Sequence, residues 1–178
     1  VGLYYIVSEL GYAPISMMTS TAMVFIMPIL FTRTGDATSE VRNKNVSELI
    51  KKLVVIGLGV TAFATLVAAA FHSHIFHLFV HDSYHSVSHF MPWAVFSGGI
   101  FSVALICASR IMALLKTKEM IGAAVGSSVI GIVAAFAGVH YFSLAGAVGA
   151  MVVHSFSYFL WIAFKLRSIQ KSIDKQAA

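Results

Sequence analysis

Residues 53–71 read LVVIGLGVTAFATLVAAAF, a stretch without a charged side chain, and Lys51 and Lys52 stand directly before it. A bilayer has a hydrocarbon core of about 30 Å, which a helix of about 20 apolar residues can cross. A helix is the favoured conformation there because it satisfies its backbone hydrogen bonds internally. The stretch therefore predicts a membrane-spanning helix.

Four further stretches have the same character. Hydrophobic residues make up 58% of the chain and charged residues 11%, with a mean hydropathy of +0.86, far from the balance of a soluble domain. We predict an all-α, polytopic transmembrane helix bundle in a single unit that covers residues 1–178. Its five spans are expected at about 3–32, 53–71, 92–115, 121–140 and 144–164, and a tail at 165–178.

Local signals refine these spans. Pro14 and Pro28 are expected to kink the first span, and the short link 141–143 predicts an antiparallel hairpin of the last two. Asn45 is predicted to cap a helix that approaches the second span along the membrane surface. The fourth span is rich in small residues, and its Gly122–Gly126 pair predicts close helix packing within the bundle.

The positive charges indicate an orientation. All twelve Lys and Arg residues fall into three clusters, and the connections around 72–91 and 140–144 contain none. Short loops rich in Lys and Arg stay in the cytoplasm, so the C-terminal tail is expected inside and the N-terminus outside. Positive residues at helix ends, rather than on one continuous face, argue against a nucleic-acid partner. The clusters are Arg33, Arg42, Lys44, Lys51 and Lys52; Arg110, Lys116 and Lys118; and Lys165, Arg167, Lys171 and Lys175.

Three polar residues lie where a span is expected, and such positions are candidate functional sites. Glu9 either lines a substrate or ion cavity or lies close enough to the outer surface to reach water. Arg110 either binds an anionic group in a cavity or extends to the cytoplasmic headgroups. His154 either faces a cavity or is a neutral ring that hydrogen-bonds a neighbouring helix.

A row of histidines in the outer connection raises the question of a metal site. On one helix His77, His81, His85 and His89 would share a face, which makes His77, His81 and His85 weak candidates for metal ligands. The sequence His81-Asp-Ser-Tyr-His reads as a turn that would break this face, so a solvated loop without metal is the favoured interpretation. No nucleotide-binding loop, nucleophile elbow or carboxylate pair is present, so we expect neither an enzyme nor a cofactor.

Three groups of residues carry a resemblance to a known family. They are Gly2-Leu-Tyr4 with Pro28-Ile-Leu-Phe and Gly35-Asp36, then Tyr84 with Met91-Pro92-Trp93, and then Gly146-Ala-Val-Gly149. Together they resemble the C-terminal half of polysaccharide flippases, which share a superfamily with the MATE multidrug antiporters. Members have two bundles of six helices around a central cavity, and five spans with an outside start resemble the last five of twelve helices.

The resemblance implies a function for the whole transporter. It would move an undecaprenyl-linked oligosaccharide, as used for O-antigen and other surface polysaccharides, across the bacterial inner membrane, in contact with membrane lipids. The N-terminus of this chain would be periplasmic, its C-terminus cytoplasmic, and a missing N-terminal bundle would be its partner.

Two alternatives remain open: a MATE-type cation-coupled multidrug exporter and a structural membrane subunit without transport activity. A flippase should have a cavity with cationic residues for pyrophosphate, an exporter an acidic or aromatic cavity, and a structural subunit none.

Overall fold

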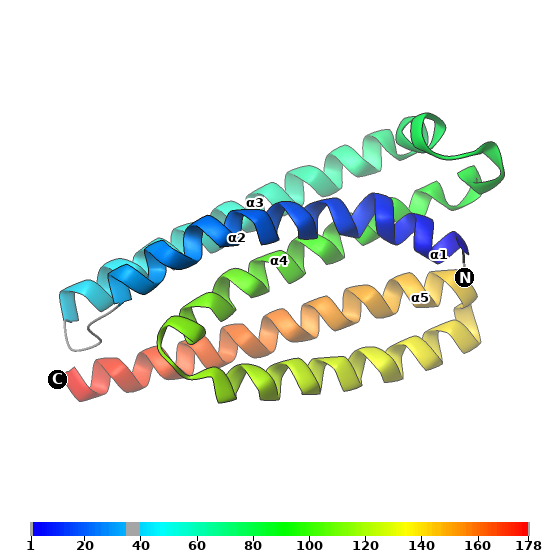
Figure 1. The fold of residues 1–178 in the computed structure, drawn as a ribbon. Coiled ribbons are helices and arrows are strands. Elements are labelled where there is room, and N and C mark those ends of the chain that lie inside the picture. The colour runs from blue at the N-terminus through cyan, green and yellow to red at the C-terminus, as the bar shows by residue number, and fades with distance from the viewer. Residues whose placement is uncertain (1, 35–39, 178) are drawn as a thin grey trace.

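The computed structural model describes residues 2–34 and 40–177, and in this part of the chain every element is a helix. The predicted all-α class is confirmed. Long helices run side by side along an elongated bundle, and successive helices reverse direction (Figure 1). Four helical stretches are long and apolar enough to cross a membrane: Gly2–Leu30, Asn45–Phe79, Asp82–Ala113 and Thr117–Ser172.

The first predicted span consists of three helical pieces in series. They are α1 (Gly2–Val7), the π-helical turn η1 (Ser8–Tyr12) and α2 (Ala13–Thr34). The wide turn η1 comes just before Pro14, whose ring crowds the carbonyl group four residues earlier and removes one hydrogen bond. By contrast, α2 is unbroken at Pro28. The distortion of this span therefore lies at Pro14 alone.

Helix α3 (Glu40–Phe79) is longer at both ends than the predicted span 53–71. It already includes Asn45, so the prediction that Asn45 caps a separate helix is wrong. Tertiary packing explains the difference: Val46 and Ile50 are buried against Leu30 of α2, which stabilises the helical turns before the apolar stretch.

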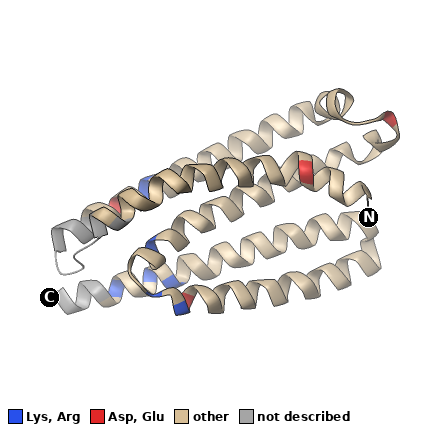
Figure 2. Cartoon of the chain, in the orientation of Figure 1, with Lys and Arg blue, Asp and Glu red and all other residues tan. Residues whose placement is uncertain are grey.

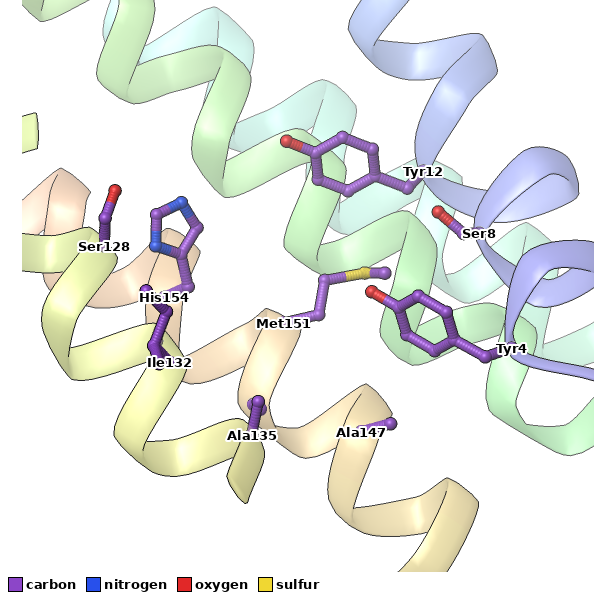
Figure 3. A pocket seen from close by; sticks show the side chains of 11 residues that line it. Tyr4, Ser8, Tyr12, Ser128, Ile132, Ala135, Ala147, Met151 and His154 are labelled. Carbon is purple, nitrogen blue, oxygen red and sulfur yellow. The ribbon is translucent and has the colours of Figure 1, made fainter. Parts of the chain in front are cut away.

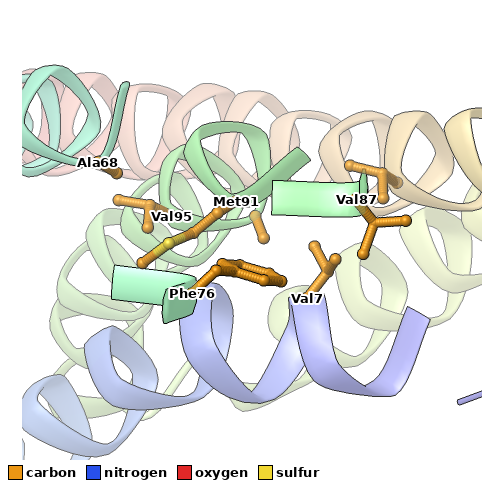
Figure 4. Close-up of a cluster of buried hydrophobic side chains, with 8 residues drawn as sticks. Val7, Ala68, Phe76, Val87, Met91 and Val95 are labelled. Atoms are coloured by element: carbon orange, nitrogen blue, oxygen red, sulfur yellow. The ribbon is translucent and has the colours of Figure 1, made fainter. Parts of the chain in front are cut away.

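A second buried cluster holds the far end of α3. Phe76, which is fully buried, packs with Val7 of α1 and Met91 of α4 (Met91–Ala113), and Val87 of the 3₁₀ helix η2 (Asp82–Phe90) completes the group (Figure 4). Four elements thus meet around one aromatic ring, and the connection 72–91, predicted as a solvated loop, is mostly helical.

Helix α4 is the centre of the bundle. Among the four helical stretches that could cross a membrane, the one that contains α4 is the most buried. In its apolar segment 61% of the residues are buried, against 6%, 11% and 17% in the other three stretches. It contacts α2, α3 and α5 (Thr117–Ala177), and small residues make this possible. At Gly99, for example, an added Cβ would lie only 2.8 Å from Cβ of Thr61 on α3. Three neighbours can surround α4 because many of its buried positions are Gly, Ala or Ser.

Helix α5 doubles back on itself at Ser143, whose backbone angles (φ 49°, ψ −121°) are not helical (Figure 1). Two arms, 117–142 and 144–177, result, in the antiparallel arrangement that the short link predicted. Gly126 faces the ring of Trp161, Gly131 faces His154, and Gly138 faces Gly146, so small residues let the arms approach closely. Gly122, the other half of the predicted pair, has no such neighbour.

The charges divide along the long axis of the bundle. The described Lys and Arg residues gather at the end that holds the C-terminus, the end of α4 and the start of α5 (Figure 2). At this end Lys165 Nζ lies 2.6 Å from Glu119 Oε2 and joins the two arms of α5. The N-terminus, η2 and the point where α5 doubles back lie at the opposite end (Figure 1).

The contact between the α5 arms can be tested at Gly138. A Cβ at this position would lie 2.7 Å from the carbonyl oxygen of Gly146, and backbone cannot move aside as a flexible side chain can. We expect Gly138→Ala to lower the free energy of unfolding by about 1–3 kcal/mol, the usual cost of an extra group in a packed site. Unfolding in mixed micelles with increasing SDS, followed by circular dichroism, measures this.

Gly122→Ala is the matched control, since it lies on the same arm with open space around it. There alanine should leave stability unchanged or raise it by about 0.5–1 kcal/mol through its better helix propensity. Equal stability of the two variants would contradict the close approach of the arms.

Candidate functional site

A cavity of about 590 Å³ opens at the basic end of the bundle, between α3, α4 and the second arm of α5. Each of the three elements supplies at least one cation. Three of the five α3 residues, Ser47, Ile50 and Lys51, come from the helical turns before the predicted span, so the cavity depends in part on this extension. Its lining residues are Ser47, Ile50, Lys51, Val54, Val55, Cys107, Arg110, Phe159, Ala163, Leu166, Arg167, Gln170 and Lys171.

The lining is strongly positive. It includes Lys51, Arg110, Arg167 and Lys171, and no Asp or Glu is among the described residues that line it. Arg167 and Lys171 are four residues apart, so they lie on the same face of their helix. We call this site the basic cavity. Four cations around one apolar-walled cavity suit a ligand with several negative charges.

Arg110 is the most buried of these cations. Its side chain is 1% exposed, one turn before the end of α4 at Ala113. The structure places it in the basic cavity rather than at the surface of the chain. Sequence reasoning found Arg110 because charges inside spans are rare, but it assigned Lys51, Arg167 and Lys171 only to orientation. The available signals were the i, i+4 spacing of Arg167 and Lys171 and the position of all three residues near helix ends.

A second cavity, of about 500 Å³, lies between the N-terminal helix and the two arms of α5 (Figure 3). Tyr4, Ser8 and Tyr12 line it from one side, and Ser128 and His154 line it from the other. Ser8 and Tyr12 are four residues apart in η1 and lie on the same side of it. We call it the aromatic cavity, and its remaining lining is mostly Ala, Ile and Met.

His154 lines the aromatic cavity and also hydrogen-bonds the other arm of α5. Its Nδ1 lies 3.1 Å from the backbone carbonyl oxygen of Ser127 on the other arm of α5. A carbonyl oxygen only accepts, so Nδ1 carries a proton and donates it. The same ring lines the aromatic cavity and stacks near Phe101, at a centroid distance of 6.1 Å. Next to it, the Ser155 and Ser97 hydroxyls are 2.8 Å apart and join α5 to α4.

In the sequence, Glu9 lies between Ser8 and Tyr12, which both line the aromatic cavity. Glu9 itself is not among the lining residues. Its side chain is exposed on η1. A role of Glu9 in a substrate or ion cavity therefore stays a prediction.

The structure brings together two of the three histidines considered as metal ligands. The rings of His77 and His85 are 4.0 Å apart between centroids, and Asp82 lies beside them. His81 does not join them, because its Nδ1 accepts from the backbone N–H of Ser83 and caps η2. Sequence spacing missed Asp82, since the metal-site alternative placed 77–89 on one regular helix, whereas α3 ends at Phe79.

No protein-family model, curated protein or solved structure matches this chain.

Proposed function

We propose that this chain forms part of a transporter that moves an undecaprenyl-linked oligosaccharide across the bacterial inner membrane for surface polysaccharide synthesis. The observation that carries the proposal is the basic cavity. Its ligand would be the diphosphate that joins the lipid to the sugar. With the basic end in the cytoplasm, as positive loops favour, the cavity would face the leaflet in which the substrate is made.

The chemistry of the cavity fits such a ligand. A diphosphate carries several negative charges on closely spaced oxygens, and the planar guanidinium groups of Arg110 and Arg167 can bind two of these oxygens at once. Lys51 and Lys171 add charge from either side. The apolar residues Val54 and Val55 of α3 also line the cavity and offer a surface for the lipid chain.

The burial pattern supports a place within a larger assembly. Large apolar side chains on α2, α3 and α5 are exposed, among them Phe25, Phe63 and Phe136. Such side chains suit contact with lipid or with further transmembrane helices. We propose five crossings, with each arm of α5 counted as one, and a further N-terminal bundle as the partner. Two cavities between helices also favour transport over a purely structural role.

The aromatic cavity supports a second candidate, a MATE-type cation-coupled multidrug exporter. Tyrosine faces attract organic cations, and the lining carries no positive charge unless His154 is protonated. Glu9, exposed next to this cavity, would be the group that binds the coupling ion. This candidate ranks second because it leaves the four cations of the basic cavity without a role.

The flippase proposal predicts that Lys51→Gln weakens binding of undecaprenyl diphosphate. One cation near the membrane surface contributes about 1 kcal/mol, so the dissociation constant should rise about fivefold. Native mass spectrometry of the purified chain in nanodiscs, titrated with undecaprenyl diphosphate, measures it. Lys52→Gln is the matched control, because Lys52 is exposed and absent from the lining, and it should bind like the wild type.

Two results would overturn this proposal. One is a wild type that binds undecaprenyl diphosphate no better than phosphatidylglycerol. The other is an equal loss in Lys51→Gln and Lys52→Gln, which would reduce the effect to general surface charge.

The exporter candidate predicts a different pair of results. Tyr4→Ala should weaken binding of tetraphenylphosphonium about two- to fivefold, since one cation–π contact contributes about 0.5–1 kcal/mol at such a site. Tyr5→Ala removes the neighbouring, more exposed ring outside the cavity lining and should have no effect. Isothermal titration calorimetry in detergent micelles measures the affinity of each variant for tetraphenylphosphonium. Equal affinity of the two variants would argue against the exporter.

A further inference from the structure

Three side chains with metal-binding groups meet at the end of the bundle opposite the basic cavity. His77 is in the last turn of α3, and Asp82 and His85 are in the first turns of η2. Each offers one ligand atom, and these atoms lie within 4.8 Å of one another. The distance between His85 Nδ1 and Asp82 Oδ1 is 3.6 Å. Two ligands bound at about 2.0–2.1 Å in a tetrahedral site are separated by a similar distance.

A hydrogen bond prepares His85 for this role. Its Nε2 lies 3.1 Å from the backbone carbonyl oxygen of Val80, so Nε2 carries a proton and donates it. In the neutral ring Nδ1 is then an acceptor that lies beside the Asp82 carboxylate, another acceptor. Histidines that bind metals commonly donate their second ring nitrogen to a backbone carbonyl in this way. The arrangement thus suits a cation between the two groups.

The two segments that carry these residues are held together by contacts that need no metal. His72 Nδ1 lies 3.0 Å from Oγ of the buried Ser88, which joins α3 to η2. Phe76 and Val87 are buried in the same cluster. His81, at the break between the helices, caps η2 through Ser83. A ligand set held by independent packing loses little entropy when an ion binds.

We propose that His77, Asp82 and His85 form a binding site for one divalent transition-metal ion, with Zn²⁺ as the ion that fits best. Two imidazoles and one carboxylate are typical zinc ligands, with a fourth position open to water. Calcium and magnesium fit less well because they take six or more ligands, mostly oxygens. A bound ion would link the end of α3 to η2 and so stiffen the connection before α4.

The test uses the full chain in detergent, purified through an affinity tag that contains no histidine. Zn²⁺ is titrated in competition with a chromophoric chelator. We expect one Zn²⁺ per chain for the wild type. Loss of a residue that hydrogen-bonds a metal ligand weakens metal binding by about tenfold or more, and loss of the ligand itself should weaken it at least as much. We therefore expect a loss of about tenfold or more in each of the variants His77→Ala, His85→Ala and Asp82→Asn.

His74→Ala and His89→Ala are the matched controls, since they remove neighbouring exposed histidines outside the ligand set. They should bind within about twofold of the wild type, well below the loss expected for a ligand. The Asp82 side chain is 90% exposed, so Asp82→Asn tests the site without disturbing the fold. Circular dichroism checks that the histidine variants remain helical.

The visible absorption of bound Co²⁺ gives a second readout, which should indicate a tetrahedral site in the wild type and change in Asp82→Asn. Three results would overturn the proposal. They are no Zn²⁺ binding by the wild type, an unchanged affinity in Asp82→Asn, or an equal loss in His74→Ala, which would mean binding by exposed histidines in general.

Discussion

A charged side chain is costly inside a hydrocarbon layer, and the architecture of this chain follows from that constraint. Long apolar stretches become helices, because a helix satisfies the hydrogen bonds of its own backbone without water. The charges collect where these helices end. Because successive helices reverse direction, basic segments far apart in sequence meet at one end of the bundle (Figure 2). The basic cavity forms where three of these ends converge.

Helix α4 allows this convergence. Its Gly, Ala and Ser positions let α2, α3 and α5 approach it closely, and it carries Arg110 into the basic cavity. At the other end the same helix begins in the cluster around Phe76, next to the proposed metal site. The two ends therefore have opposite chemistry: cations that suit an anionic ligand at one end, and imidazole with carboxylate at the other. One central helix connects both.

The sequence predicts those features that depend on local composition. Hydropathy gave the apolar stretches and the hairpin, and the rarity of charge in spans identified Arg110. Helix ends were predicted poorly, because contacts such as those of Val46 and Phe76 with distant residues lengthen α3 beyond its apolar stretch. The sequence also does not show which distant residues come together: Lys51 and Arg167 line the same cavity only after folding. The set His77, Asp82 and His85 depends on where α3 breaks, and four-residue spacing alone favoured His81.

We propose that the basic end and the histidine-rich end lie on opposite sides of one membrane. Single cysteines at Ser86 and Thr117, both exposed, test it directly in a chain whose buried Cys107 is replaced by alanine. A membrane-impermeant maleimide is applied to bacterial spheroplasts and to inverted membrane vesicles. We expect labelling of Ser86→Cys in spheroplasts and of Thr117→Cys in inverted vesicles. Labelling of both from the same side, or in the reverse order, would contradict it.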